Sequence, residues 1–253
     1  MLNLRKRHSE ILYLMANWET VSVNHRGAST KKKPASPARR KAKQERSAET
    51  INVILEATAR VLIQHGYRAT TTRRIATAAG YSVGTLYQYF ADKDAIVGRL
   101  IDRHYADLVT SFVRALESSG LGPLESAIEE MLHAMARAYA NSRSLHRVIV
   151  EQIPHAERSK RVTEMRAVMA MHIVEFLTAH AAEVRASDID LAAAVVVHSA
   201  QALIQMSTQD SAAHGRLIPE IRTLICSYLR ATSTNRTQAL DGMTSSVTLG
   251  SAR

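Results

Sequence analysis

Residues 70–93 constrain the fold of this chain more than any other segment, because they predict two short helices joined by a glycine turn. The first helix stops at Gly80, the residue type that tolerates the left-handed conformation closing a helix. Ser82 then stands where a new helix needs an N-cap, and that second helix spans about residues 83–89. Such a pair predicts a helix-turn-helix, whose second helix lies in the DNA major groove.

Side chains around the two helices suit contacts with phosphates and bases. Thr70 or Thr71 would cap the first helix, with Arg73 and Arg74 at its start, and Lys93 lies just past the second helix. Hydroxyls, backbone amides and cations at such positions hold phosphates. On the second helix, the four-residue spacing of Leu86 and Phe90 predicts that both face inward. The residues predicted to face outward are Thr85, Tyr87, Gln88 and Tyr89.

The charge of the chain is concentrated at its N-terminal end. The net charge is +10. Residues 1–50 carry 12 Lys/Arg against 4 Asp/Glu, residues 51–100 carry 6 against 3, and residues 101–253 carry 15 against 16. A basic first hundred residues followed by a near-neutral body is typical of a protein that meets a polyanion at one end.

The helix-turn-helix segment resembles the TetR/AcrR family of transcriptional regulators over residues 46–98. Tyr89 stands where the family often has His, and Arg74 where it often has an acidic residue, and both differences could change the operator sequence. Elsewhere the chain resembles the family only in its length and helical character. The runs that carry the resemblance are Gly66-Tyr67-Arg68-Ala69-Thr70-Thr71-Thr72-Arg73-Arg74-Ile75-Ala76 and Ala79-Gly80-Tyr81-Ser82-Val83-Gly84-Thr85-Leu86-Tyr87-Gln88-Tyr89-Phe90-Ala91-Asp92-Lys93.

The resemblance implies roles for individual residues of the helix-turn-helix. Thr71, Tyr87 and Lys93 would contact phosphates, and Tyr89 could contact either phosphates or bases. Against bases, Gln88 can form the two-hydrogen-bond pair that glutamine makes with adenine. The residues that we predict to bind DNA are Thr71, Thr72, Arg73, Ser82, Val83, Gly84, Thr85, Tyr87, Gln88, Tyr89 and Lys93.

Composition and apolar spacing predict an all-α chain. Aromatic residues make up only 5% of the sequence, while Ala, Leu and Met abound, which favours helix over strand. The N-terminal three-helix domain would be followed by a helical ligand-binding and dimerisation domain. The predicted helices after the recognition helix span about 92–118, 124–141, 143–155, 157–184, 188–208 and 217–232, and the first helix of the chain spans about 46–65. Pro219 would fall in the first turn of the last helix.

The predicted domains have the following bounds. A basic, disordered N-terminal arm covers 1–45, the helix-turn-helix domain 46–93, the effector-binding and dimerisation domain 94–232, and a disordered tail 233–253. The arm holds a basic run with two prolines at residues 31–41, which is either a solvated tail or an arm that adds DNA contacts. Met15 is a second possible start of translation.

The resemblance implies a pocket for a small hydrophobic ligand in the C-terminal domain. Methionine suits such a pocket because its side chain is adaptable and polarizable. The alternative is that these residues form ordinary core. The candidate ligand-binding residues are Tyr105, Met131, Met135, Tyr139, Met165, Met169, His172, Phe176 and His198.

The last two helices are apolar enough to form a dimer interface. A two-fold dimer would present two recognition helices one turn of DNA apart, roughly 34–36 Å. The candidate interface residues are Leu191, Val195, Ala202, Leu203, Ile221, Leu224, Ile225 and Leu229.

Several function classes find no support in the sequence. Cys226 is the single cysteine, which excludes an intramolecular disulfide and a cysteine-built zinc site, and its helical context predicts a buried side chain. The eleven histidines lack the four-residue spacing that brings two imidazoles together on a helix, so no metal or cofactor is expected. No apolar run approaches the ~20 residues of a membrane span, and no signal peptide is evident. We expect a cytoplasmic protein without enzymatic activity.

The sequence therefore predicts a homodimeric DNA-binding regulator with a palindromic operator, and the resemblance implies that it is a repressor. A small hydrophobic ligand would release it from DNA by binding the DNA-incompetent conformation more tightly. The alternative keeps the DNA binding without a ligand, so that the regulator is constitutive or is controlled by a protein partner.

Overall fold

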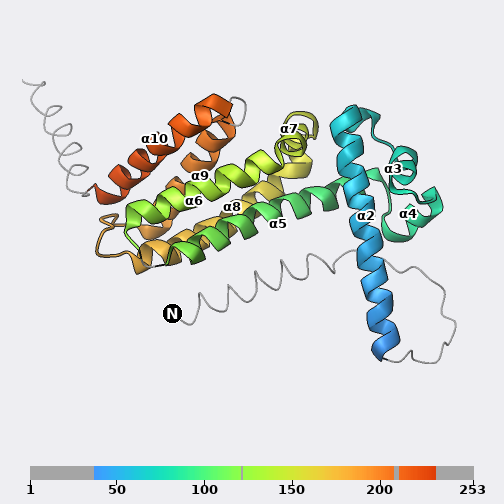
Figure 1. Ribbon diagram of the computed structural model, residues 1–253, viewed down its shortest axis with the longest axis horizontal. Coiled ribbons are helices and arrows are strands. Elements are labelled where there is room, and N and C mark those ends of the chain that lie inside the picture. The colour runs from blue at the N-terminus through green and yellow to red at the C-terminus, as the bar shows by residue number, and fades with distance from the viewer. Residues whose placement is uncertain (1–36, 121, 208–210, 232–253) are drawn as a thin grey trace, which may run out of the picture. The chain divides into compact units, whose positions relative to one another are not determined.

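The structure is a computed structural model, and it describes residues 37–120, 122–207 and 211–231. The predicted arm as far as residue 36 and the predicted tail from residue 233 lie outside the described residues. The all-α fold class is confirmed (Figure 1). The helices are α2 (Pro37–Ala69), α3 (Thr72–Ala79), α4 (Val83–Tyr89), α5 (Lys93–Ser119), α6 (Leu124–Asn141), α7 (Arg143–Gln152), α8 (His155–Ala179), α9 (Ile189–Ser207) and α10 (Ser211–Arg230).

The described chain forms two compact units. The first unit contains the described residues up to Asp107 together with Ser142–Thr163, and the second contains Leu108–Asn141 and the described residues from Glu164 onward. This division differs from the expected boundary after residue 93, because α7 packs against α2 and the N-terminal part of α5 stays with the helix-turn-helix. Helices α5 and α8 therefore each contribute to both units.

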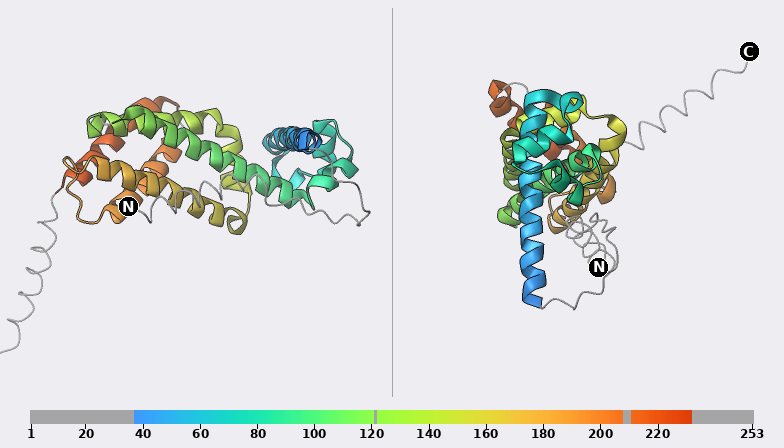
Figure 2. Two further views of the ribbon diagram at one scale, coloured as in Figure 1. Left: turned by 90° about the horizontal axis from the view of Figure 1, so that it is seen from below. Right: turned by 90° about the vertical axis from the view of Figure 1, so that its right-hand side faces the viewer.

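The caps predicted for the helix-turn-helix are confirmed. The Thr71 hydroxyl accepts the Arg74 N–H at 3.2 Å and begins α3, which ends at Gly80 with φ 73° and ψ 23°. The Ser82 hydroxyl accepts the Thr85 N–H at 3.0 Å and begins α4. Each cap satisfies a backbone N–H that a helix leaves unpaired in its first turn. Figure 2 shows α2 end-on in its left view, with α3 and α4 beside it.

Helix α2 begins at Pro37 rather than at Arg46, so part of the segment expected as a disordered arm is helical. Its predicted end at Gly66 coincides with a kink, where the backbone has φ 75° and ψ 170°. Gln152 of α7 lies against this kink, and its Oε1 accepts the Tyr67 N–H at 3.0 Å. The bare Cα of Gly66 makes the approach possible, since a Cβ there would collide with the Gln152 Oε1.

We expect Gly66→Ala to destabilise the protein more than Gly80→Ala. Alanine at Gly80 meets no neighbour and costs about 1 kcal/mol for its left-handed backbone. At Gly66 the backbone lies in a region that only glycine occupies readily, and the new Cβ displaces Gln152, so the cost rises to about 3 kcal/mol. Urea unfolding of the two variants measures the difference, and equal midpoints would contradict this explanation.

Helix ends in the C-terminal half differ from the prediction in three places. Helix α7 stops at Gln152 because Ile153, which precedes Pro154, is extended at ψ 132°. Helix α8 ends at Ala179 and not near 184, and His180 begins a turn in which both ring nitrogens lie within hydrogen-bond distance of backbone oxygens. Helix α10 begins at Ser211, so Pro219 lies inside it, and the prediction that this proline falls in the first turn is wrong.

Each unit has its own apolar core. In the first unit, Leu62 of α2, Ile75 of α3 and Leu86 of α4 are at most 1% exposed, which fixes the faces that these helices present to solvent. In the second unit, α10 packs against α6 and α9, and Arg222 joins α10 to Glu129 of α6 through a 2.8 Å ion pair. Within the described residues, no helix is long and apolar enough to cross a membrane.

Candidate functional site

The second helix of the helix-turn-helix offers its polar face to solvent. Leu86 is 1% exposed and anchors α4 against the first unit, whereas Tyr87 is 56% exposed and Gln88 is exposed beside it. The predicted inward and outward faces therefore hold for Leu86, Tyr87 and Gln88. The side chains of Thr85, Tyr89 and Phe90 are half-buried, so their exposure lies between the two predictions. A duplex can approach Tyr87 and Gln88 without any rearrangement of the helix.

Two residues that we predict to bind DNA lie at the start of α3. Thr71 and Arg73 are exposed there, next to backbone N–H groups at the positive end of the helix. Arg74 instead donates from Nη1 to the Ala69 carbonyl at 2.5 Å, so its guanidinium caps the C-terminal end of α2. The adjoining face of α2 and α3 is an open groove of about 670 Å³, lined by Val61, Gln64, His65, Ala69, Thr71, Arg73, Arg74, Thr77 and Ala78.

Lys93 is held in place by Tyr67 and Asp94, neither of which is among the predicted DNA-binding residues. Its Nζ lies 4.0 Å from the Tyr67 ring centroid and 3.7 Å from Asp94 Oδ1. The Tyr67 hydroxyl donates to the same Asp94 oxygen at 2.9 Å. A cation over an aromatic face is attracted by the ring, so Tyr67 limits the freedom of Lys93 at the start of α5. Tyr67 lies within the run of residues that resembles the family, and that position is the signal in the sequence that could have pointed to its role beside Lys93.

Two polar contacts hold α7 and the start of α8 against α5 within the first unit. His104 Nε2 and His146 Nδ1 are 2.9 Å apart, and both side chains are buried. Arg161 forms an ion pair with Asp102, and its guanidinium lies across α5 at Gly98, where a side chain would collide with it. Sequence spacing predicts neither pair, because the two members of each are more than forty residues apart.

Burial lowers the pKa of both histidines. The pKa of His104 falls from 6.5 to about 3, first because the ring is buried and second because of the charge on His146. The pKa of His146 falls to about 4, again mainly through burial, with the Arg158 charge as the second cause. The pair is therefore neutral at physiological pH, with one imidazole donating to the other.

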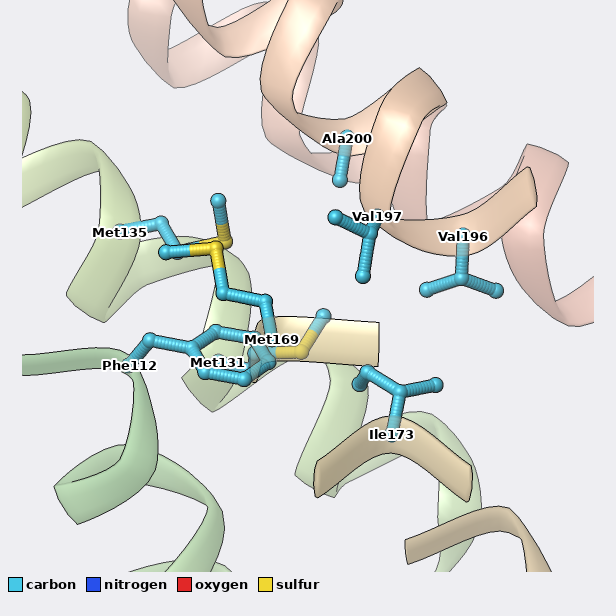
Figure 3. A pocket seen from close by; sticks show the side chains of 8 residues that line it. All are labelled: Phe112, Met131, Met135, Met169, Ile173, Val196, Val197 and Ala200. Atoms are coloured by element: carbon cyan, nitrogen blue, oxygen red, sulfur yellow. The ribbon is translucent and has the colours of Figure 1, made fainter. Parts of the chain in front are cut away.

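Three of the predicted ligand-binding residues meet in one apolar cluster of the second unit. Met131, Met135 and Met169 point toward one another from α6 and α8 (Figure 3). The side chains close on each other and leave no room for a water molecule. We call this set the methionine cluster, and its members are Phe112, Met131, Met135, Met169, Ile173, Val196, Val197 and Ala200.

The other predicted ligand-binding residues lie outside the methionine cluster. Tyr105 is buried, but it belongs to the first unit. His172 is half-buried on α8 and lies 3.8 Å from Glu175, and His198 is exposed on α9. The remaining three are buried in the second unit, and they are Tyr139, Met165 and Phe176.

The predicted dimer residues divide into an exposed and a buried set. Leu191 and Val195 of α9 and Leu224 of α10 are 51%, 38% and 53% exposed. Ala202 is exposed and Leu203 is half-buried on α9. The buried set packs inside its own chain and consists of Ile221, Ile225 and Leu229. Cys226 is also buried, as predicted.

Two family models place the chain among helix-turn-helix regulators of transcription. The model for bacterial regulatory proteins of the tetR family matches residues 54–100, and the model for the tetracyclin repressor-like C-terminal domain matches residues 123–229. Together they cover more than half of the chain. The chain belongs to the TetR family, a non-enzymatic family of DNA-binding transcriptional regulators, and the resemblance stated from the sequence is confirmed.

Curated relatives match part of the chain. The HTH-type transcriptional repressor KstR2 of Rhodococcus jostii is 29% identical over 110 residues, which are 44% of this chain and 53% of that protein. KstR2 of Mycobacterium tuberculosis is 39% identical over 72 residues, which are 28% of this chain and 36% of that protein. The matched region thus spans about half, or less, of the relatives' own length.

Solved structures share the fold at low identity. GusR of Salmonella enterica has a TM-score of 0.59 and 22% identity, covering 73% of this chain and 97% of that chain. The fatty acid degradation regulator FadR from Bacillus halodurans has a TM-score of 0.58 and 18% identity, covering 78% of this chain and 99% of that chain. At these identities the likeness concerns the fold alone.

Proposed function

We propose that this regulator is a repressor that binds a palindromic operator as a homodimer, with α4 of each protomer in the major groove. The observation that carries the proposal is the exposed polar face of α4, with Tyr87 and Gln88 free to reach base edges and phosphates. The exposed residues Thr71 and Arg73 at the start of α3, together with Lys93, would fix the register on the backbone.

The dimer part of the proposal is supported by the exposed apolar residues of α9 and α10. Leu191, Val195, His198 and Ala202 follow one another at three- and four-residue spacing and are all exposed, so they form one stripe along α9. Leu224 adds a further exposed apolar side chain on α10, the helix that packs against α9. A two-fold interface would remove this stripe from water and set the spacing of two α4 helices.

The dimer proposal predicts the behaviour of the variant Val195→Glu, Leu224→Glu. Two buried carboxylates from each protomer in a two-fold interface are strongly unfavourable, so the variant should sediment as a monomer and bind the operator at least tenfold more weakly. Val150→Glu, at an exposed apolar residue of α7 in the first unit, is the matched control and should remain a dimer. A double variant that stays dimeric would place the interface elsewhere.

An effector site at the methionine cluster completes the proposal. Methionine side chains repack readily, so a ligand could open the cluster in a conformation that binds DNA less well. The second candidate function is a regulator without a small-molecule ligand, and the closed packing of the cluster favours it. Thermal stabilisation by apolar compounds separates the two, since only an openable cluster binds them.

A further inference from the structure

Three polar side chains continue the methionine cluster by one helical turn. Each lies three or four residues from a cluster residue on the same helix, so it extends the face that the cluster occupies. The pairs are Tyr139 with Met135 on α6, Gln201 with Val197 on α9, and Arg166 with Met169 on α8.

The three side chains are connected to one another. Gln201 Nε2 donates to the Tyr139 hydroxyl at 3.2 Å, and Arg166 Nε donates to Gln201 Oε1 at 2.6 Å. Tyr139 and Gln201 are each 1% exposed, whereas Arg166 is half-buried. The chain of hydrogen bonds therefore leads from a partly exposed guanidinium into the core beside the methionine cluster, and Tyr139 continues it to Gln205.

The charge at this position is unbalanced. Among the described residues no carboxylate forms an ion pair with Arg166, in contrast to Arg222 and Arg230, which contact glutamates. A guanidinium has five N–H donors, of which Gln201 engages the one on Nε. Arginine without a carboxylate partner at the end of an apolar cluster is the arrangement that binds a carboxylate from outside the chain.

We propose that the effector is a monocarboxylate with an apolar body, whose head binds the guanidinium of Arg166 while its body enters the methionine cluster. This inference rests on the proposed effector site and adds the chemical class of the ligand. The carboxylate takes two guanidinium N–H donors of Arg166, and the body displaces the methionine side chains from one another.

Decanoate is a suitable probe, because it combines a carboxylate with a flexible apolar chain. Decan-1-ol has the same chain without the charge and serves as the matched ligand. We expect decanoate to raise the melting temperature of the full-length protein in a concentration-dependent manner and to bind at least tenfold more tightly than decan-1-ol. Isothermal titration calorimetry gives both dissociation constants.

One substitution tests the head group. Arg166→Met removes the charge and keeps an apolar stem. It should weaken decanoate binding at least tenfold and leave decan-1-ol binding unchanged. Arg137→Met, at an exposed arginine two residues from Met135, is the matched control and should bind both probes like the wild type.

The outcomes separate this inference from the function on which it rests. Equal binding of both probes, abolished together by a cluster-filling Met135→Phe, would keep the effector site and overturn the carboxylate. Decanoate binding that survives Arg166→Met would overturn the assignment of the head group. If neither probe binds while the wild type still binds its operator in the same buffer, both the carboxylate and the effector site are overturned and the DNA-binding proposal stands.

Discussion

The double variant Tyr87→Ala, Gln88→Ala is expected to lose sequence-specific binding to its operator. Both side chains are exposed on α4 while Leu86 holds the helix in place, so their removal should leave the fold intact. A side chain that reads a base edge with two hydrogen bonds contributes about 1–3 kcal/mol to discrimination. Because the variant also removes the Tyr87 hydroxyl, which we propose to bind phosphate, we expect the affinity for the operator to fall about a hundredfold.

Fluorescence anisotropy against an operator duplex and a scrambled duplex, each titrated in salt, measures this effect. Non-specific binding should persist in the variant, because it depends on Lys and Arg side chains that bind phosphates, and it weakens steeply with salt. Glu175→Ala, at an exposed residue of α8, is the control and should bind like the wild type. If the variant and the wild type bind alike with the same salt slope, α4 does not read the sequence.

Acid should destabilise the protein between pH 6.5 and about 4 through the His104–His146 pair. Both rings have a native pKa far below 6.5, so the unfolded chain binds protons that the folded chain cannot accept. Stability contributed by the neutral pair is fully present above pH 6.5 and is lost as the pH falls. At pH 5.5 each histidine costs about 1.4 kcal/mol relative to neutral pH, so the pair costs nearly 3 kcal/mol.

Urea unfolding at pH 7.5 and pH 5.5 measures the loss. In the variant His104→Met, His146→Leu, the pair is replaced by apolar side chains, and the loss should shrink to below about 1 kcal/mol. His65→Gln, at an exposed histidine of α2, should leave the wild-type loss unchanged. The explanation fails if the double variant loses as much stability at pH 5.5 as the wild type does.

Local signals in the sequence predicted the helix-turn-helix closely. The caps at Thr71 and Ser82 and the turn at Gly80 depend on residues within three or four positions, and the structure reproduces them. Helix α6 also has the predicted bounds, because a glycine-proline break precedes it. The start of α2 at Pro37 could not be predicted, since the segment 37–45 is basic and lacks an apolar stripe.

The contacts between distant segments could not be read from the sequence. Gln152 against Gly66, and His104 against His146, join residues whose separation along the chain carries no periodic signal. His104 lies within the apolar spacing of its helix, which predicts its burial but not its partner. The resemblance implies that Tyr139 contacts ligand, which stays a prediction, and the structure adds its hydrogen bond to Gln201, which in turn binds Arg166.

The most direct test of the proposed function is a footprint of the purified protein on the DNA that flanks its own coding region. We predict one discrete protected stretch with two-fold symmetric sequence, in which the two half-sites are one turn of the duplex apart, roughly 34–36 Å, and which two protomers occupy. Diffuse protection that follows no symmetric sequence and disappears uniformly with salt would contradict the proposal.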